Sequence, residues 1–151
     1  MPNVAILTDS VCCVPEDIIE ALNIRWVAYY IHRGKEVLRD LVTIQRDEFI
    51  RWLMTAEKLP TTASPGPGDY YQELEKLAAE GYRDVVTIHI TSKSSGAYQA
   101  ARVAYEMACE RLPQLRIEVI DTLNVSMCQG WMVIEAARMA AAGRAFEEIV
   151  Q

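Results

Sequence analysis

The sequence predicts an α/β protein, a three-layer sandwich in which helices cover both faces of a mostly parallel sheet. Two observations support this fold class. Short apolar runs rich in β-branched residues alternate with longer segments of helical periodicity along the chain. Apolar runs also lead directly into small polar residues, as buried parallel strands do at their carboxyl ends. Right-handed crossovers between such strands place helices on both faces of the sheet.

The first elements of this pattern are a strand, a helix and a second strand. Val4–Leu7 is a short apolar run followed by polar residues, as expected of a buried parallel strand. Pro15 stands at a first helical position with acidic residues directly after it, and the helix that it opens is expected to end near Asn23. Ile24–Ile31 is rich in β-branched and aromatic residues and is predicted to form the second strand.

The middle of the chain is predicted to contain two helices. A short extended piece around Val37 precedes Thr43, which is expected to cap the first helix. That helix stops before Pro60, because a proline excludes the preceding residue from the α region. The second helix begins at Pro67 and finishes at Gly81, a residue suited to the left-handed conformation that closes a helix.

The last third of the chain repeats the order of strand and helix. Val85–Ile90 is predicted as the third strand, and the helix that follows runs from Gly96 to about Arg111 with alanines spaced for close packing against a sheet. Ile117–Ile120 is predicted as the fourth strand. The Ala-rich segment Met127–Ala142 is predicted as a helix.

The length of the chain indicates one hydrophobic core. A chain of 151 residues with 51% hydrophobic content suffices for one well-packed domain and hardly for two. Residues 1–151 are therefore predicted to form a single α/β domain. Residues 143–151 look like the first turns of another amphipathic helix, and we expect them to lead towards a second domain that is missing from this sequence.

Composition and charge exclude several classes of protein. The net charge of −6 and the lack of a Lys/Arg cluster argue against a nucleic-acid partner. No apolar run approaches the roughly 20 residues that span a bilayer, and the N-terminus lacks the features of a signal peptide, so a soluble, cytoplasmic protein is expected. The four cysteines have neither CxxC nor Cys/His ligand spacing, which predicts free thiols and no metal site.

The most informative stretch is Val85–Ala101, in which an apolar strand runs into small polar residues and then into a helix. Unpaired amides at a helix N-terminus and a Gly in its first turn let an anion approach the backbone, and Ser92, Ser94 and Ser95 add neutral donors. The stretch therefore predicts a site for a carboxylate or a phosphate. The alternative is that Ser95 and Gly96 only cap the helix.

A second polar segment, Pro60–Asp69, has the same character and includes Thr62 and Ser64. Because ligands of open α/β sheets bind beyond the carboxyl ends of the strands, one head group could touch both polar segments. Thr62 could also belong to a hydroxyl-stabilised turn. Asp9 and Ser10 follow the first strand, and we expect them to organise its loop rather than to contact a ligand.

Four motifs stand in a distinctive order and spacing. They are TDS at Thr8–Ser10, PTTASPGPGDYY at Pro60–Tyr71, ITSKSSGAYQAA at Ile90–Ala101 and IDTLNVSMCQG at Ile120–Gly130. This pattern resembles the N-terminal domain of the DegV family across the whole chain, whereas the second domain of that family has no counterpart here. DegV proteins bind fatty acids, and some act as the acyl-carrying subunit of a bacterial fatty acid kinase.

The resemblance implies a function and a set of site residues. The carboxylate of a long-chain fatty acid such as hexadecanoate would be held by Thr62, Ser95 and Gly96. A separate ATP-dependent fatty acid kinase would be the partner, and this chain would carry substrate without catalytic activity or a cofactor. The residues expected to support the site around these groups are Asp9, Ser10, Ser64 and Ser92.

The sequence departs from the family pattern close to these residues. Ala63 stands where the family usually has Ser, Ser64 where it has Gln, Ala97 where it has Thr, and Cys128 where Gly is common. Neither Thr62 nor Ser95 is altered. The resemblance therefore implies fatty-acid binding without fixing the preferred acyl chain.

Two other classes of function remain as alternatives. A serine-dependent hydrolase would use Ser95 as nucleophile with His89 or Asp9 as activator, but the GxSxG motif is absent and His89 is expected to be a satisfied core histidine. A truncated half-domain would instead act as a protein-interaction module, through the surface that its missing neighbour would cover.

Overall fold

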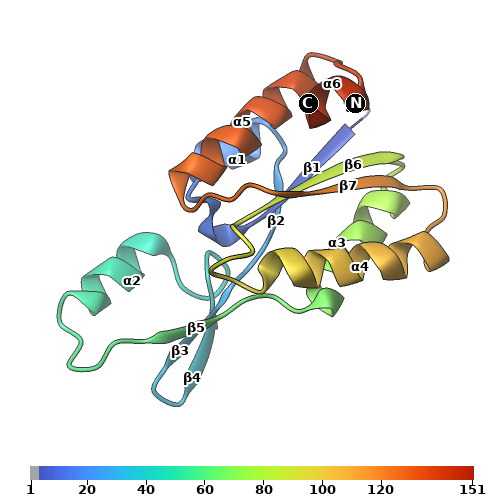
Figure 1. Ribbon diagram of the computed structural model, residues 1–151. Helices are drawn as coiled ribbons and strands as arrows, with labels where there is room; N and C mark the ends of the chain where they lie inside the picture. Colours follow the sequence, from blue (N-terminus) through green and yellow to red (C-terminus); the bar gives the residue numbers. More distant parts are fainter. Residues whose placement is uncertain (1–3) are drawn as a thin grey trace.

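A four-stranded parallel sheet lies at the centre of the computed structural model, which describes residues 4–151 (Figure 1). The strand order is β2-β1-β6-β7, and all three pairs of neighbours run parallel. These strands are β1 (Val4–Asp9), β2 (Arg25–Val27), β6 (Asp84–His89) and β7 (Arg116–Asp121). The α/β fold class and the parallel sheet predicted from the sequence are confirmed.

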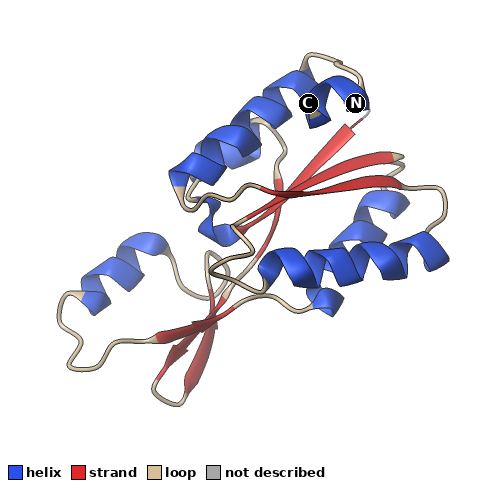
Figure 2. Ribbon diagram, in the orientation of Figure 1, coloured by secondary structure: helices blue, strands red, loops and turns tan. Residues whose placement is uncertain are grey.

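Helices cover both faces of this sheet, as predicted (Figure 2). One face carries α1 (Glu16–Ala21), α5 (Met127–Ala141) and α6 (Phe146–Val150), and the other carries α3 (Pro67–Ala79) and α4 (Ala97–Arg111). Successive side chains of a strand point to opposite faces of the sheet, and because helices cover both faces, both sets of side chains are buried. In β1, Leu7 packs with the residues of α3 and α4, whereas Ile6 packs with those of α1 and α5.

The segment predicted as one second strand is divided between two sheets, so that prediction is wrong. β2 ends at Val27 and belongs to the parallel sheet, whereas β3 (Tyr30–Arg33) belongs to a separate antiparallel sheet of order β4-β3-β5. The partners of β3 are β4 (Glu36–Arg39) and β5 (Thr61–Ala63). The second sheet projects from the body of the molecule beyond the carboxyl ends of the central strands (Figure 1).

The helix predicted to start at Thr43 begins later, as α2 (Arg46–Leu53), and ends well before Pro60. The hydroxyl of Thr43 is already engaged, because its Oγ1 accepts a hydrogen bond of 2.7 Å from the backbone N–H of Arg39. Thr43 therefore closes a turn instead of capping a helix. No residue of α2 is buried, and the helix stands apart from the central sheet (Figure 1).

Residues 143–151 fold back onto the body of the molecule. Phe146 and Ile149 of α6 are buried and pack with α5 and with Val4 of β1. A link from this segment to a second domain remains a prediction. None of the helices between residues 4 and 151 is both long enough and apolar enough to cross a bilayer.

The order of the central strands locates a crevice. The chain passes from β1 to β2 on one side, whereas β6 and β7 lie on the other side of β1, so the winding direction reverses between β1 and β6. In open α/β sheets, ligands bind beyond the carboxyl ends of the strands at such a switch point. The loops at this point are Ser10–Cys13 after β1 and Ile90–Gly96 after β6.

Candidate functional site

A cavity of about 770 Å³, partly open to solvent, lies at this switch point. Its volume is within the range of roughly 300–1,000 Å³ that is usual for small-molecule sites. The loop after β1 contributes Ser10 and Cys13, and the loop after β6 contributes Ser94, Ser95 and Gly96. The antiparallel sheet and α2 form the remaining wall, so the cavity lies between the two sheets.

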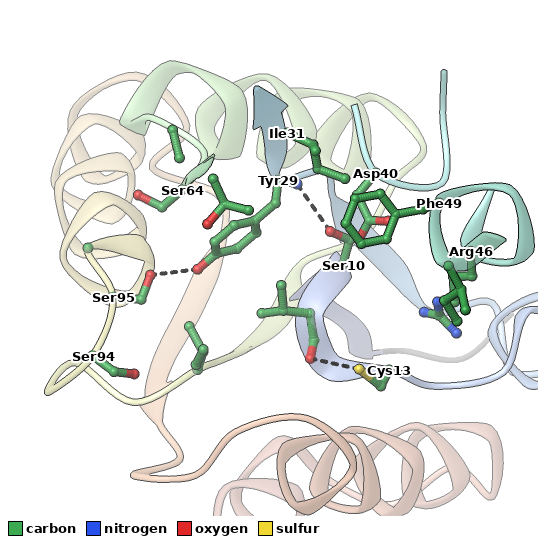
Figure 3. Close-up of a pocket in the computed structure, with 16 residues that line it drawn as sticks. Ser10, Cys13, Tyr29, Ile31, Asp40, Arg46, Phe49, Ser64, Ser94 and Ser95 are labelled. Atoms are coloured by element: carbon green, nitrogen blue, oxygen red, sulfur yellow. Dashed lines mark hydrogen bonds between the residues drawn. The ribbon is translucent and has the colours of Figure 1, made fainter. Parts of the chain in front are cut away.

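One side of the cavity is formed by neutral polar groups from two loops. Ser94, Ser95 and Gly96 come from the loop before α4, and Thr62 and Ser64 come from β5 and the residues after it. The two loops approach closely, because a Cβ atom added to Gly96 would lie 3.4 Å from the Oγ of Ser64. Ser64, Ser94 and Ser95 lie on the same side of the cavity in Figure 3.

The backbone amides of the loop after β6 are mostly occupied by partners within the protein. The N–H groups of Ser94 and Ser95 donate to Thr91 O, and that of Ala97 donates to the Oγ of Ser95 at 3.2 Å. At the helix N-terminus itself, the amides of Tyr98 and Gln99 in the first turn of α4 have no acceptor among the described residues, so the prediction of unpaired amides there is confirmed. Within Thr91–Ala97, only the amide of Gly96 has no acceptor among the residues that the structure describes.

The donors available for a ligand are thus few and specific. Those that line this side of the cavity are the N–H of Gly96 and the hydroxyl groups of Thr62, Ser64, Ser94 and Ser95. Such donors suit an acceptor-only group, and a helix N-terminus adds a favourable potential for negative charge. Their arrangement can hold a carboxylate without a cation.

The other walls of the cavity are largely apolar. They are lined by Val11 of η1 (Ser10–Cys12), Ile31 of β3, Phe49 and Ile50 of α2, and Ile90, the residue after β6. In Figure 3, Ile31 and Phe49 lie on the side of Tyr29 away from Ser95. A ligand that fits both kinds of wall has a polar head and an apolar body.

A partly buried carboxyl group, Asp40, also lines the cavity. Burial raises the pKa of Asp40 above its ordinary value, and the Ser10 hydroxyl and the Arg46 guanidinium oppose this rise. Arg46 itself donates from Nη1 to Val14 O at 3.0 Å, which ties α2 to the segment after β1. Asp40 is therefore a carboxyl whose ionisation works against the folded state.

This raised pKa predicts a pH-dependent effect of the substitution Asp40→Asn. A raised pKa stabilises the folded state below the ordinary carboxyl pKa of about 3.9, and this contribution is lost as pH rises through the folded-state value. Asp40→Asn should therefore gain stability relative to the wild type as pH rises from about 3.5 to neutral. Urea unfolding at several pH values measures this difference. A difference independent of pH would contradict it.

Two of the residues expected to support the site lie away from the cavity. Asp9 is fully buried, and its carboxylate accepts hydrogen bonds from Ile90 N at 3.2 Å and from the Gln129 side chain at 3.0 Å. Asp9 thus holds Ile90, the first residue of the loop after β6, from the protein interior. Ser92 is exposed, does not line the cavity and donates its N–H to Asp121 Oδ1, so a role in supporting the site stays a prediction for this residue. Ser10 and Ser64 do line the cavity.

The geometry does not favour Ser95 as a nucleophile activated by His89. His89 is fully buried, its Nδ1 is 3.3 Å from Asp9 Oδ2, and its ring packs edge-on against Tyr70. His89 is absent from the cavity wall, and its Nε2 is buried without a partner. No serine and histidine pair is therefore formed at this site. Across residues 4–151, no group of three or more His, Cys, Asp or Glu is placed to hold a metal ion.

Sequence reasoning missed Tyr29 as a residue of this site. Tyr29 is 7% exposed and lines the cavity, and its hydroxyl lies 2.6 Å from the Oγ of Ser95 (Figure 3). It falls between β2 and β3, at the break that the sequence pattern does not reveal. A tyrosine within an aromatic, strand-like run gives no local signal of such a role.

The fold and this cavity define a doubly wound α/β protein with a small-molecule site at its switch point, built to take a polar head beside an apolar body. The chain belongs to the DegV family. The family model, described as "Uncharacterised protein, DegV family", matches residues 3–151.

Comparisons with individual proteins agree with this assignment. A DegV domain-containing protein of Caldanaerobacter subterraneus is 37% identical over 150 residues, 99% of this chain and 51% of that protein. A stearic-acid-binding protein from Eubacterium ventriosum superposes with a TM-score of 0.89 at 28% identity, over 97% of this chain and 50% of that chain. A fatty-acid-binding DegV protein from Thermus thermophilus superposes with a TM-score of 0.82 at 28% identity, also over 97% of this chain and 50% of that chain. The chain thus spans about half the length of these relatives.

Proposed function

We propose that this protein binds a long-chain fatty acid, such as hexadecanoate, and holds its carboxylate with Ser95, Gly96 and Thr62. The observation that carries the proposal is the division of one cavity into a side of neutral donors and apolar walls. The fatty-acid ligands named for the structures from Eubacterium ventriosum and Thermus thermophilus support it. Ser64 would add a hydroxyl beside the head group, whereas Ser10 lines the cavity next to Asp40, on the other side of Tyr29 (Figure 3).

The energetics of such a ligand agree with this division of the cavity. Each hydrogen bond to a charged group contributes roughly 1.5–3 kcal/mol, so two or three donors orient the carboxylate. Burial of about a dozen methylenes at roughly 0.8 kcal/mol each would add around 10 kcal/mol before ordering costs. The head group therefore sets the orientation of the ligand, and the tail supplies most of the affinity.

The protein would act as a carrier without catalytic activity of its own. Ser95 has no neighbouring base, because its hydroxyl contacts are Tyr29 and the amide of Ala97. A carrier of this kind would present the bound acid to a separate ATP-dependent fatty acid kinase. The kinase partner, the cytoplasmic location and the alternative of a protein-interaction module remain predictions from the sequence.

Thiol alkylation tests whether a fatty acid occupies this cavity. Cys13 is exposed and lines the cavity, whereas Cys109 and Cys128 are exposed elsewhere. Saturating hexadecanoate should slow the reaction of Cys13 with iodoacetamide several-fold and leave Cys109 and Cys128 unaffected. Cys12 should stay unreactive throughout, since burial raises its pKa to about 11 and the thiolate is the nucleophile.

Peptide mass spectrometry after timed alkylation gives the rate at each cysteine separately. Equal protection of all three exposed thiols would indicate aggregation with lipid instead of binding in the cavity. An unchanged rate at Cys13, in a sample where native mass spectrometry detects no bound hexadecanoate, would contradict the proposed function.

A further inference from the structure

The hydrogen bond between Tyr29 and Ser95 couples two elements of the cavity that are far apart in the sequence. The phenol oxygen of Tyr29 lies 2.6 Å from the Oγ of Ser95, and the backbone N–H of Tyr29 donates to the Oγ of Ser10 at 3.1 Å. Tyr29 is thus fixed at both ends, by the loop after β1 and by the loop after β6. Its side chain crosses the cavity wall between the hydroxyl-lined side and Asp40 (Figure 3).

The hydrogen bonds around the Ser95 hydroxyl determine which proton it can offer to a ligand. A serine hydroxyl has one proton to donate and two lone pairs that accept. One lone pair of Ser95 Oγ accepts from the amide of Ala97. Burial raises the pKa of Tyr29 to about 12, against the opposing effect of Ser95, so the phenol keeps its proton at neutral pH and can donate to the second lone pair. When Tyr29 donates in this way, both lone pairs of Ser95 Oγ are occupied, so Ser95 can only donate its own proton, and that proton is free for a ligand.

We propose that Tyr29 is a positioning residue that makes Ser95 an obligatory donor. Such a donor selects a carboxylate, which only accepts, over an alcohol, whose own proton would find no free lone pair on Ser95. The inference rests on the proposed function, because it assigns the proton of Ser95 to the fatty-acid carboxylate. A chain of donors from Tyr29 through Ser95 to the ligand also polarises each bond in the same direction, which strengthens the last one. The amide of Gly96 adds a second donor beside it.

The substitution Tyr29→Phe tests this role, with Tyr30→Phe as its matched control. Tyr30 is the adjacent tyrosine, and its hydroxyl donates to Asp69 Oδ1 at 3.0 Å without lining the cavity. The probes are hexadecanoate and 1-hexadecanol, titrated at pH 8 and followed by native mass spectrometry. Tyr29→Phe should weaken the binding of hexadecanoate about 3- to 10-fold, as for a lost hydrogen bond of roughly 0.5–1.5 kcal/mol. The affinity for hexadecanol should be unchanged or higher. Tyr30→Phe should change neither.

The ratio of the two affinities separates positioning from packing. If Tyr29 only fills space, the affinities for both ligands fall by the same factor, and the inference is overturned. Wild-type affinity for hexadecanoate in Tyr29→Phe also overturns it. If Tyr29 acts through Ser95, its substitution has no further effect on hexadecanoate in a Ser95→Ala background, whereas additive losses contradict a shared proton path.

These outcomes are distinguishable from failure of the proposed function. A wild-type chain that does not bind hexadecanoate rejects the proposed function, and the inference with it. A wild-type chain that binds, a Ser95→Ala variant that binds weakly and a Tyr29→Phe variant that behaves as wild type reject the inference alone. A reduced ratio of acid to alcohol affinity in Tyr29→Phe supports both.

Discussion

Replacement of Gly130 by alanine is expected to destabilise the protein by about 3 kcal/mol, the upper part of the usual range for overpacking a core. Gly130 lies in α5 where this helix packs on η1. A Cβ atom there would lie 2.5 Å from the carbonyl oxygen of Cys12 and 3.2 Å from a methyl group of Val14. Because the closest contact is to backbone, a side-chain rotation cannot relieve it, and either α5 or the η1 turn must shift.

Such a shift would also reach the cavity. The η1 turn carries Ser10, and Cys13 follows it, so movement of the Cys12 carbonyl displaces part of the cavity wall. We therefore expect Gly130→Ala to weaken ligand binding as well as folding. The substitution thereby tests whether the close approach of α5 to η1 holds the site together.

Gly68→Ala is the matched control for this prediction. Gly68 also lies in a helix, α3, but a Cβ atom there would meet nothing within 4 Å. Removal of a helical glycine without a clash should stabilise the protein by about 0.5 kcal/mol. Urea unfolding of both variants measures the difference. Equal stabilities would contradict the packing of α5 against η1 described above.

Much of the fold could be predicted because its signals are local. The parallel strands are apolar runs whose side chains are buried on both faces, and β6 was predicted from such a run at Val85–Ile90, within one residue of each of its actual ends. The alanines of α4 could be interpreted in the same way, because small side chains allow close packing. Ala97, Ala101, Ala104 and Ala108 are all buried.

The change of sheet between Val27 and Tyr30 could not be predicted. The aromatic and β-branched pattern of Ile24–Ile31 is continuous, because both halves are extended and partly buried. Only the partners differ, since β2 pairs with β1 and β3 pairs with β4 and β5. Strand partners depend on contacts across long sequence separations, which periodicity does not report.

The candidate site was only partly predictable for the same reason. The two polar loops were visible as sequence, and the structure brings Ser64 and Gly96 together. Ser92 and Ser95 are both serines of the loop after β6, yet of these two only Ser95 lines the cavity. The amide of Ser92 is held by Asp121, a residue 29 positions away, which turns this part of the loop outward. Likewise Tyr29 meets Ser95 across 66 positions.

Ser95→Ala is expected to weaken hexadecanoate binding about 10- to 100-fold, which corresponds to roughly 1.5–3 kcal/mol for a hydrogen bond to a charged group. The variant removes the only proton that Ser95 can donate. The fold should remain intact, because Ser95 is partly exposed and its loop is also held by the Ser94 and Ser95 amides on Thr91 O. Titration of hexadecanoate followed by native mass spectrometry measures the loss, and thermal unfolding without ligand checks the fold.

Ser92→Ala provides the control, because it removes a serine hydroxyl from the same loop without touching the cavity. Its affinity for hexadecanoate should equal that of the wild type. A second control uses the ligand, because Ser95 contacts the head group and not the tail. The ratio of affinities for hexadecanoate and dodecanoate should therefore be the same in Ser95→Ala and in the wild type. If that ratio changes, Ser95 acts on the tail or on the shape of the cavity. Equal losses in Ser92→Ala and Ser95→Ala would place the carboxylate elsewhere.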